Sequence, residues 1–350
     1  MISVIIGAYN GERFLDKCIQ SILRQTIDPE KMEIIIVDDA SNDGTVELLR
    51  KYEEKYPNRI MLVLNEYNSS ISKQNGRNIG VEYANGDYIM FLDQDDWYRD
   101  DAFEKLHKMM DENPELDYIE YDFLKVSYEG DGIDSEEQGS GVLYKCYIKD
   151  ENQRKVFFEK GILPGAAYVW TKIYRKKFLE EMNIKHNDGE IRAGYSDNFF
   201  SGLVVTNCRS FGKLCEKFYF YRVYDGSYSC TSKWNDMRQF ERCKTGVFFA
   251  EECERRGMQL QKNEVVEYMF LRIFLLKTFA RFLLTFKPIP YEIFAFMQDE
   301  IRRRCPNCKN NSIVKSNINL YRVVELLDYD WTPTFLESLK IMVLEESEKR

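Results

Sequence analysis

Short apolar runs alternate with helix-like patterns over residues 1–125, and this alternation is the feature that most constrains the fold. The runs occupy residues 2–6, 33–37, 60–64, 88–92 and 118–123. The segments between them place apolar side chains three or four residues apart, as on one face of a helix. Runs that are apolar throughout are typical of parallel strands covered by helices on both faces. The sequence therefore predicts an α/β fold with a mostly parallel central sheet flanked by helices.

Polar groups stand directly after three of these runs. They are Ala8-Tyr9-Asn10, Asp38-Asp39 and Asp93-Gln94-Asp95-Asp96. Each group alone is compatible with a turn or a helix cap, because Asp and Asn are ordinary residues in both. Ligands of open α/β sheets bind beyond the carboxyl ends of the strands. The recurrence of such groups at successive strand ends therefore predicts a binding edge.

The carboxylates of Asp93 and Asp95 are spaced so that both can face one point if the second lies in a turn. Oxygen ligands suit Mg²⁺ or Mn²⁺, which commonly share their coordination with substrate phosphates. The chain has only two histidines, His107 and His186, and neither lies in a ligand-spaced cluster, which argues against a zinc-histidine centre. No Walker loop and no GxGxxG motif follows the first run. We expect a Mn²⁺ or Mg²⁺ site.

Composition narrows the class of protein. A net charge of −9 argues against nucleic acid as a partner, because phosphate binding needs a basic face. Nine cysteines without regular spacing are typical of reduced thiols in a cytoplasmic protein, and Cys305-Pro-Asn-Cys308 lacks the second pair that a zinc knuckle requires. The apolar stretch 268–286 is interrupted by three basic residues, so we expect no membrane span. An amphipathic helix over 264–286 leaves peripheral contact with the inner membrane face as an alternative to a core helix.

Long helical patterns without strand signals begin near residue 234. They cover 237–256, 264–286 and 291–304. A polar, glycine-rich stretch over 129–141 is expected to be a loop. We therefore expect a boundary near Ser232, with an α/β domain over 1–232 and a helical domain over 233–350.

Seven segments of the chain resemble the family 2 inverting glycosyltransferases with the GT-A fold. They are residues 3–10, 33–44, 76–80, 91–97, 170–174, 195–200 and 219–227. The first four keep the order and spacing of the family's motifs. The resemblance implies a nucleotide-sugar-binding half over 1–125 and an acceptor half over 126–232.

The same resemblance implies roles for individual residues. Tyr9 and Asp39 would contact the nucleotide base, Arg77 the donor, Asp93 the ribose or the metal, and Asp95 the metal on the diphosphate. Asn10, Asp38 and Lys172 complete the expected binding set. Lys172 would hold an acceptor or donor phosphate, and a solvated surface lysine fits the pattern almost as well. Asp197 would be the catalytic base; Ser196 stands before it where the family has Glu, and Asp188 and Glu190 are the next candidates.

The implied activity is metal-dependent inverting transfer of one sugar at a time. The donor would be a nucleotide sugar, expected to be a UDP-sugar, and the acceptor a hydroxyl of a glycan, polyol-phosphate or lipid-linked molecule. Decoration of bacterial-type cell-surface polysaccharide or teichoic acid is the implied role. The alternatives are a nucleotidyltransferase and a non-catalytic sugar-binding or assembly subunit. Because all donor motifs precede residue 234, we expect the later helices to serve acceptor recognition or assembly.

Overall fold

The computed structural model describes residues 1–72, 74–127, 139–163, 168–188, 196–224, 238–276 and 278–348. The chain forms two compact units, each built from separate segments. The sheet unit comprises Met1–Ile148, Ala167–Ala193 and Asn207–Thr231. The helical unit comprises Lys149–Ala166, Gly194–Thr206 and Ser232–Arg350. The last segment of the helical unit begins at Ser232, but two earlier segments also pack with the later helices. Whether 1–232 folds as a domain stays a prediction.

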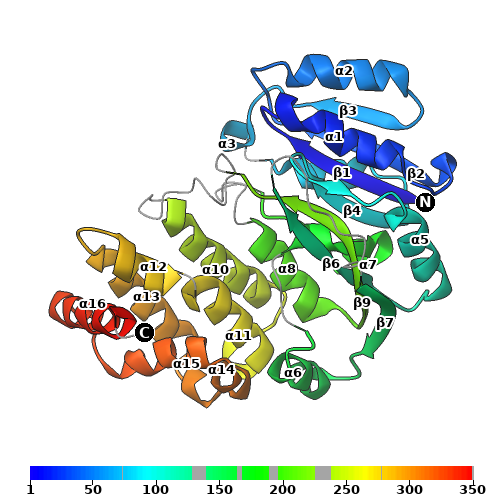
Figure 1. Ribbon diagram of the computed structural model, residues 1–350. Helices are drawn as coiled ribbons and strands as arrows, with labels where there is room; N and C mark the ends of the chain where they lie inside the picture. Colours follow the sequence, from blue (N-terminus) through cyan, green and yellow to red (C-terminus); the bar gives the residue numbers. More distant parts are fainter. Residues whose placement is uncertain are drawn as a thin grey trace. The chain divides into compact units, whose positions relative to one another are not determined.

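Nine strands of the described residues form one mixed sheet in the sheet unit (Figure 1). They are β1 (Ile2–Ala8), β2 (Met32–Asp38), β3 (Ile60–Leu64), β4 (Tyr88–Asp93), β5 (Trp97–Tyr98), β6 (Tyr118–Val126), β7 (Gly139–Tyr147), β8 (Lys172–Arg175) and β9 (Ser210–Arg222). Their order is β3-β2-β1-β4-β8-β6-β9-β5, with β7 paired to β9. The first four strands in this order are parallel, whereas β8 runs antiparallel to both β4 and β6. The carboxyl ends of β1, β2 and β4 therefore share one edge with the amino end of β8.

Helices connect these strands. They are α1 (Glu12–Leu23), α2 (Thr45–Lys55), α3 (Ser69–Ser72), α4 (Gly76–Tyr83), α5 (Ala102–Glu112) and α7 (Lys176–Glu181), with short turns η1 (Pro29–Lys31) and η3 (Val169–Thr171). The helix-like patterns between the apolar runs are confirmed by α1, α2, α4 and α5. The pattern also predicts Gly86 as the C-cap of α4, and this is wrong because Ala84 is the cap. Gly86 instead lies against Ser3, where a Cβ would come within 2.6 Å of the hydroxyl.

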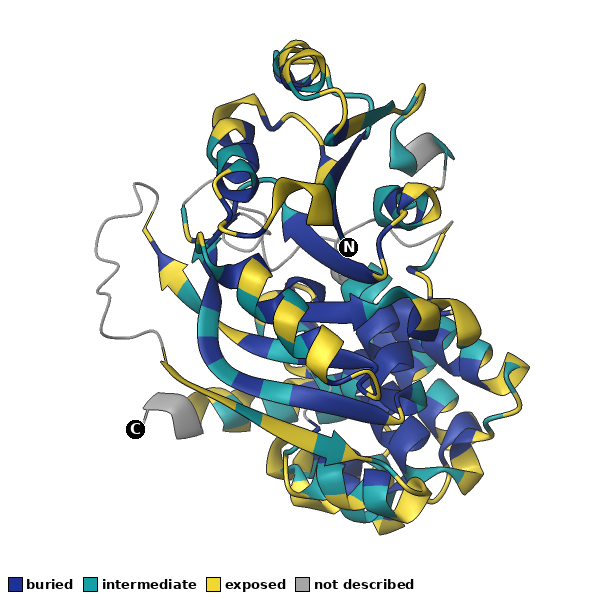
Figure 2. Cartoon of the chain, turned by 90° about the vertical axis from the view of Figure 1, so that its right-hand side faces the viewer, coloured by how far each residue is buried: buried dark blue, intermediate teal, exposed yellow. Residues whose placement is uncertain are grey.

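The core of the sheet unit follows directly from the apolar runs. Of the first five residues of β1, four are apolar and fully buried. Strands β2 and β4 are buried almost throughout. Figure 2 shows the strands largely buried and the outer faces of the helices exposed. Strand β7 differs, since most of its side chains are exposed. Residues 129–138 of the expected polar loop lie outside the described residues, and 139–141 begin β7.

The helical unit contains the later helices and two earlier ones. They are α6 (Glu151–Glu159), α8 (Ser196–Asn207), α10 (Arg238–Arg255), η5 (Leu260–Lys262), α11 (Glu264–Leu271), η6 (Arg272–Leu276), α12 (Thr278–Thr285), α13 (Tyr291–Arg304), η7 (Cys308–Asn310), α14 (Ser312–Ser316), α15 (Ile318–Glu325), η8 (Leu326–Asp328) and α16 (Pro333–Glu348). The helix expected over 264–286 is thus α11 and α12, joined by the π-helical turn η6. Tyr268 and Phe282 are buried, which fits a core helix. No described helix is long and apolar enough to span a bilayer.

Candidate functional site

The loops after β1 and β2 hold each other in place. Asn10 and Ala40 adopt left-handed backbone conformations, with φ of 48° and 59°, which turn the chain sharply after each strand. The Asn10 backbone N–H donates to Ser41 Oγ at 2.9 Å, and the Asn42 N–H donates back to Asn10 Oδ1 at 2.9 Å. The predicted residue Asn10 therefore joins the two turns, and the ring of its neighbour Tyr9 is 47% exposed.

The adjacent carboxylates Asp38 and Asp39 accept hydrogen bonds from different segments of the chain. Asp38 is buried and accepts hydrogen bonds from the N–H and hydroxyl of Ser41, at 2.9 and 2.5 Å. Asp39 is half-buried and accepts from the N–H and hydroxyl of Ser69, both at 2.7 Å, and from Asn68 Nδ2 at 3.0 Å. Asp38 thus holds its own turn, while Asp39 holds the start of α3. Their contact with a nucleotide stays a prediction.

Gln94, the middle residue of the carboxylate loop, connects that loop to β1. Its Oε1 accepts from the Tyr9 N–H at 2.8 Å, and its Nε2 donates to the Tyr9 carbonyl at 3.0 Å. This two-point contact fixes the backbone beneath the exposed Tyr9 ring. Gln94 has no role among the sequence-based predictions, since nothing in the local pattern indicates a partner 85 residues away.

Helix α4 brings a cation to the carboxylate loop. Asn75 caps the helix by accepting from the Arg77 N–H at 3.0 Å. Arg77 Nη2 then donates to Asp93 Oδ1 at 2.6 Å. Asp188, a candidate base, is exposed and accepts from the Asn75 N–H at 2.7 Å. The structure thus brings together the predicted residues Arg77 and Asp93.

Hydrogen bonds join the other two carboxylates of the loop, Asp95 and Asp96, to the end of β9 and the residues just after it. Asp96 is 1% exposed and accepts from Tyr219 Oη and from the Arg222 N–H, both at 2.7 Å. Burial, followed by the charges of Asp95 and Asp93, raises the pKa of Asp96 well above its ordinary value. Asp95 accepts from Tyr224 Oη at 3.2 Å. Sequence analysis missed the role of Tyr219 and Tyr224, which reach the loop only through the pairing of β5 with β9.

Asp93 and Asp95 have the chemistry of a divalent-cation site. Burial is the main reason that the pKa of Asp95 is raised to about 6. The negative charge of Asp93 raises it further, because the two carboxylates repel each other. A cation would relieve this repulsion, and both groups offer hard oxygen ligands. Within the described ranges, no group of three or more His, Cys, Asp or Glu side chains is placed to hold a metal ion. A Mg²⁺ or Mn²⁺ ion at this pair would take its other ligands from water and substrate phosphates, and its presence stays a prediction.

Lys172 lies at the start of β8 and is only 1% exposed. Its Nζ donates to the Tyr168 carbonyl at 2.8 Å and lies 3.8 Å from Glu120 Oε2. It is therefore not a solvated surface lysine. Holding a phosphate would require this amine to leave its partners, and that role stays a prediction.

Asp197 lies in the first turn of α8, in the helical unit. A carboxylate there also interacts favourably with the helix dipole. Its assignment as the base stays a prediction. Glu190, Tyr195, Gly226 and Ser227, which belong to the candidate bases or matching motifs, lie outside the described residues.

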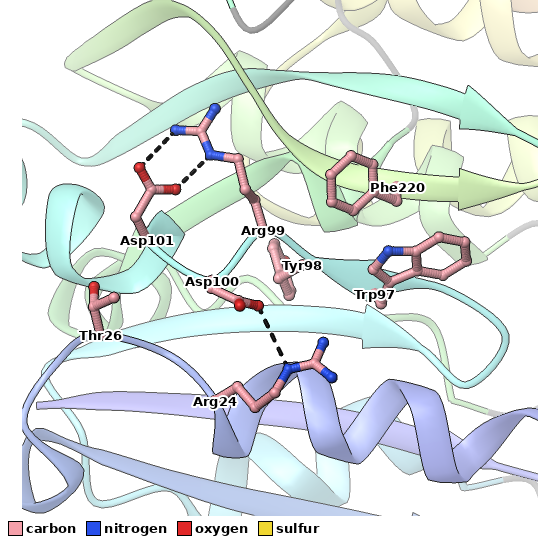
Figure 3. A pocket seen from close by; sticks show the side chains of 8 residues that line it. All are labelled: Arg24, Thr26, Trp97, Tyr98, Arg99, Asp100, Asp101 and Phe220. Carbon is pink, nitrogen blue, oxygen red and sulfur yellow. Dashed lines mark hydrogen bonds and ion pairs between the residues drawn. The ribbon is translucent and has the colours of Figure 1, made fainter. Parts of the chain in front are cut away.

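A pocket of about 400 Å³ opens elsewhere in the sheet unit, at the end of α1 and beside β5 (Figure 3). Its charged lining is already paired. Arg24 contacts Asp100 at 3.7 Å, and Arg99 forms an ion pair with Asp101. This pocket includes none of the predicted donor-binding or metal-binding residues.

Comparison with known proteins identifies a matching family and several similar bacterial proteins. The sequence profile of Glycosyl transferase family 2 matches residues 3–181, just over half of the chain. The minor teichoic acid biosynthesis protein GgaB of Bacillus subtilis is 39% identical over 232 residues, covering 64% of this chain and 23% of GgaB. Glycosyltransferase GlyA of Streptococcus pneumoniae is 28% identical over 248 residues, covering 67% of this chain and 32% of GlyA. The chain thus spans less than two thirds of the length of these relatives.

Solved structures show the same fold. The crystal structure of Staphylococcus aureus TarS matches with a TM-score of 0.62 and 19% identity, covering 93% of this chain and 54% of TarS. TarS 1–349 in complex with UDP-GlcNAc matches with a TM-score of 0.55, covering 93% of this chain and 90% of that one. The expected GT-A arrangement, a curled sheet flanked by helices with further C-terminal helices, is confirmed. Together with the profile match, these observations show that the chain belongs to glycosyl transferase family 2.

Proposed function

We propose that the chain is a metal-dependent, inverting glycosyltransferase that moves a sugar from a UDP-sugar to a hydroxyl of a glycan, polyol-phosphate or lipid-linked acceptor. The observation that carries this proposal is the set of contacts along one sheet edge. It runs from the Asp39 turn through Tyr9 and Gln94 to the Asp93 and Asp95 carboxylates. This edge presents an exposed aromatic ring and a cation-binding carboxylate pair, which suit a nucleobase and a diphosphate.

Each donor-side residue has a part in this proposal. Tyr9 and Asp39 contact the base, Arg77 contacts the donor, and Asp93 and Asp95 hold Mn²⁺ or Mg²⁺. A bound cation would supply the positive charge that stabilises the departing nucleoside diphosphate. Because Arg77 already pairs with Asp93, its guanidinium is positioned beside the same diphosphate site.

On the acceptor side, we assign proton removal to Asp197. As the acceptor oxygen attacks the anomeric carbon, its proton passes to the Asp197 carboxylate and the bond to the diphosphate breaks. Attack from the face opposite the leaving group inverts the configuration. One protein base suffices for this reaction, whereas a glycosidase needs two carboxylates.

The named relatives support the choice of donor and the class of acceptor. TarS has been solved with UDP and with UDP-GlcNAc. TarS of Staphylococcus aureus is named a poly(ribitol-phosphate) β-N-acetylglucosaminyltransferase. GgaB is named for minor teichoic acid biosynthesis. We therefore infer a UDP-sugar donor and a cell-envelope polymer as the product.

The test is a thermal-shift screen of nucleoside diphosphates and UDP-sugars, with and without Mn²⁺, because a ligand that binds only the folded state raises its stability. We expect UDP with Mn²⁺ to raise the melting temperature, and Asp95→Ala to abolish the Mn²⁺-dependent part. The matched control is Asp100→Ala, which removes the same charge from an exposed position outside the carboxylate loop. Donor hydrolysis is then measured for the ligands that bind.

Two results would contradict the proposal. If Asp95→Ala retains the metal dependence of UDP binding, the cation site is elsewhere. If the protein releases pyrophosphate from nucleoside triphosphates and hydrolyses no UDP-sugar, a nucleotidyltransferase replaces the glycosyltransferase. Folding of both variants is checked by their melting temperatures without ligand.

A further inference from the structure

Aromatic side chains gather beside the carboxylate loop, at the end of the sheet formed by β6, β8 and β9. We define the aromatic platform as Phe123, Tyr168, Trp170, Tyr219 and Tyr221. Trp170 is at its centre, stacked on Tyr219 and Tyr221 with ring centroids 4.4 and 5.4 Å away. The rings of Phe123 and Tyr168 lie 4.8 and 4.9 Å from the ring of Trp170.

Strand pairing places the aromatic platform at the same edge as Asp93. In the antiparallel pair of β4 and β8, Met90 faces Ile173. Trp170 precedes Ile173 by three residues and Asp93 follows Met90 by three, so both lie beyond the pair in the same direction. Tyr219 then makes the connection, since its hydroxyl donates to Asp96 at 2.7 Å and accepts from the Asp93 N–H at 3.3 Å. The platform is continuous with the proposed donor site, on the side away from β1 and β2.

Tyr168 is the most exposed member of the platform, whereas Phe123 and Tyr221 are only partly exposed. It is 46% exposed, whereas Trp170 beneath it is 4% exposed. Its backbone is fixed by Lys172 Nζ and Thr171 Oγ1, which donate to its carbonyl at 2.8 and 3.1 Å. An aromatic ring held on a packed aromatic base loses little conformational entropy when a ligand covers it. This favours a binding surface over an incidental exposed side chain.

The charges beneath the platform decide what kind of ligand it fits. The Lys172 amine is buried and faces Glu120, so its charge is compensated inside the protein. Asp122, the next outward carboxylate along β6, interacts with the charges of Lys213 and Lys217, so its charge is compensated as well. The lysines beside these carboxylates are thus already engaged, whereas the C–H face of a pyranose ring is weakly positive and stacks on electron-rich aromatic faces.

We propose that the aromatic platform is an acceptor subsite, in which Tyr168 stacks on the uncharged pyranose ring that receives the sugar. This inference rests on the proposed function and narrows its acceptor from any hydroxyl compound to a glycan ring, as opposed to a polyol phosphate. It also gives Lys172 a role as a positioning residue for Tyr168.

The test compares transfer to methyl β-D-glucopyranoside and methyl β-N-acetylglucosaminide with transfer to ribitol phosphate. For a glycoside that is used, we expect Tyr168→Ala to raise the acceptor KM about 10-fold, equivalent to ~1.4 kcal/mol. Tyr168→Phe keeps the ring and should restore the KM to within about 2-fold, because stacking needs only the aromatic face. The donor KM should stay unchanged in both variants. Tyr144→Ala on β7, which removes another exposed tyrosine, is the control.

An unchanged glycoside KM in Tyr168→Ala would overturn the inference, and so would exclusive use of ribitol phosphate. A second measurement does not depend on turnover. Saturation-transfer NMR should detect the methyl glycosides on the wild-type protein and lose the signal with Tyr168→Ala. If the wild type hydrolyses no UDP-sugar yet this signal depends on Tyr168, the proposed function fails and sugar binding at Tyr168 stands without an acceptor role. Absence of the signal from the wild type contradicts sugar binding at the platform.

Discussion

Neighbouring carboxylates at the sheet edge differ in function because they differ in burial. Asp38 and Asp96 are each 1% exposed. They accept hydrogen bonds from the hydroxyls of Ser41 and Tyr219, respectively, which offsets the cost of removing a charged group from water. Asp93 and Asp95 are half-buried and keep oxygen atoms within reach of a ligand. Removal of a buried member should therefore disturb the loop, whereas removal of Asp95 should disturb binding alone.

Gln94→Ala should weaken nucleotide binding, although Gln94 acts only through the backbone of Tyr9. The substitution removes both hydrogen bonds to the Tyr9 backbone, each of which contributes about 1 kcal/mol net. We expect UDP affinity in Mn²⁺ to fall by about 5- to 30-fold, measured by titration calorimetry. Gln20→Ala on α1, whose amide binds Tyr52, is the matched control. Equal UDP affinity in the Gln94 variant and the wild type would show that the contact does not order Tyr9.

Asp197→Asn should separate chemistry from binding. The change keeps the size of the side chain and removes its basicity, so transfer should fall by about 100- to 10,000-fold while donor affinity is retained. Asp188→Asn tests the other described candidate base. Its amide oxygen can still accept from the Asn75 N–H, so the variant removes basicity and keeps the structural contact. Initial rates and UDP affinity are measured for both variants. If Asp188→Asn loses transfer and Asp197→Asn does not, the base is Asp188.

At the scale of elements, helix α4 matters because it carries Arg77 and packs closely on the sheet. The contact is possible because Gly80 has no side chain where α4 crosses β1, and a Cβ added there would overlap Ile5 Cγ2. Ile5 is fully buried and β-branched, so it has little freedom to yield. The position of Arg77 beside Asp93 therefore depends on a glycine three residues further along the helix.

Gly80→Ala should destabilise the protein despite the higher helix propensity of alanine. Overpacking of this kind costs about 1–3 kcal/mol, and any displacement of α4 moves Arg77 away from Asp93. We expect a lower urea midpoint and weaker UDP binding. Gly76→Ala in the same helix is the control, because its Cβ would meet Val37 Cγ1 at an ordinary 3.5 Å. A Gly80 variant as stable as the Gly76 variant would mean that β1 yields to the methyl group.

At the scale of the whole molecule, the two units are interleaved along the chain. Helix α8 precedes β9 in sequence yet belongs to the helical unit, where Gly202 lies against the ring of Phe249. Helix α6 is joined to α11 by the Lys155–Glu264 ion pair at 2.6 Å and by the Phe158–Tyr268 ring contact. The later helices thus complete the packing of segments that precede residue 232.

A fragment ending at residue 232 should therefore fail to fold cooperatively. It would leave without partners the buried apolar side chains of α8, which include Phe200 and Leu203. Each such side chain contributes about 1.5–3 kcal/mol when buried, and the total stability of a domain is only about 5–15 kcal/mol. We expect strong binding of a hydrophobic dye and no sharp urea transition. A chain ending at residue 332, which lacks only α16, is the control and should unfold cooperatively.

Cooperative unfolding of the 232-residue fragment would instead establish 1–232 as an independent domain. Its UDP affinity would then test whether the residues from 234 onward are dispensable for donor binding. Intact affinity would support that division of roles, and a loss in the folded fragment would contradict it.

Neighbouring residues are enough to predict the strands β1 to β4 and the helices between them, because burial on both faces leaves a continuous apolar run. They also place Tyr9, Asp93 and Asp95 at strand ends and Arg77 in a helix, whereas the roles of these residues stay predictions. By contrast, the contact of Gln94 with Tyr9, the contact of Tyr219 with Asp96 and the burial of Lys172 all arise from tertiary packing. These contacts join residues that are far apart in the chain, and their geometry depends on strand register and packing. No local periodicity carries that information, so the partners of each carboxylate became visible only in the folded chain.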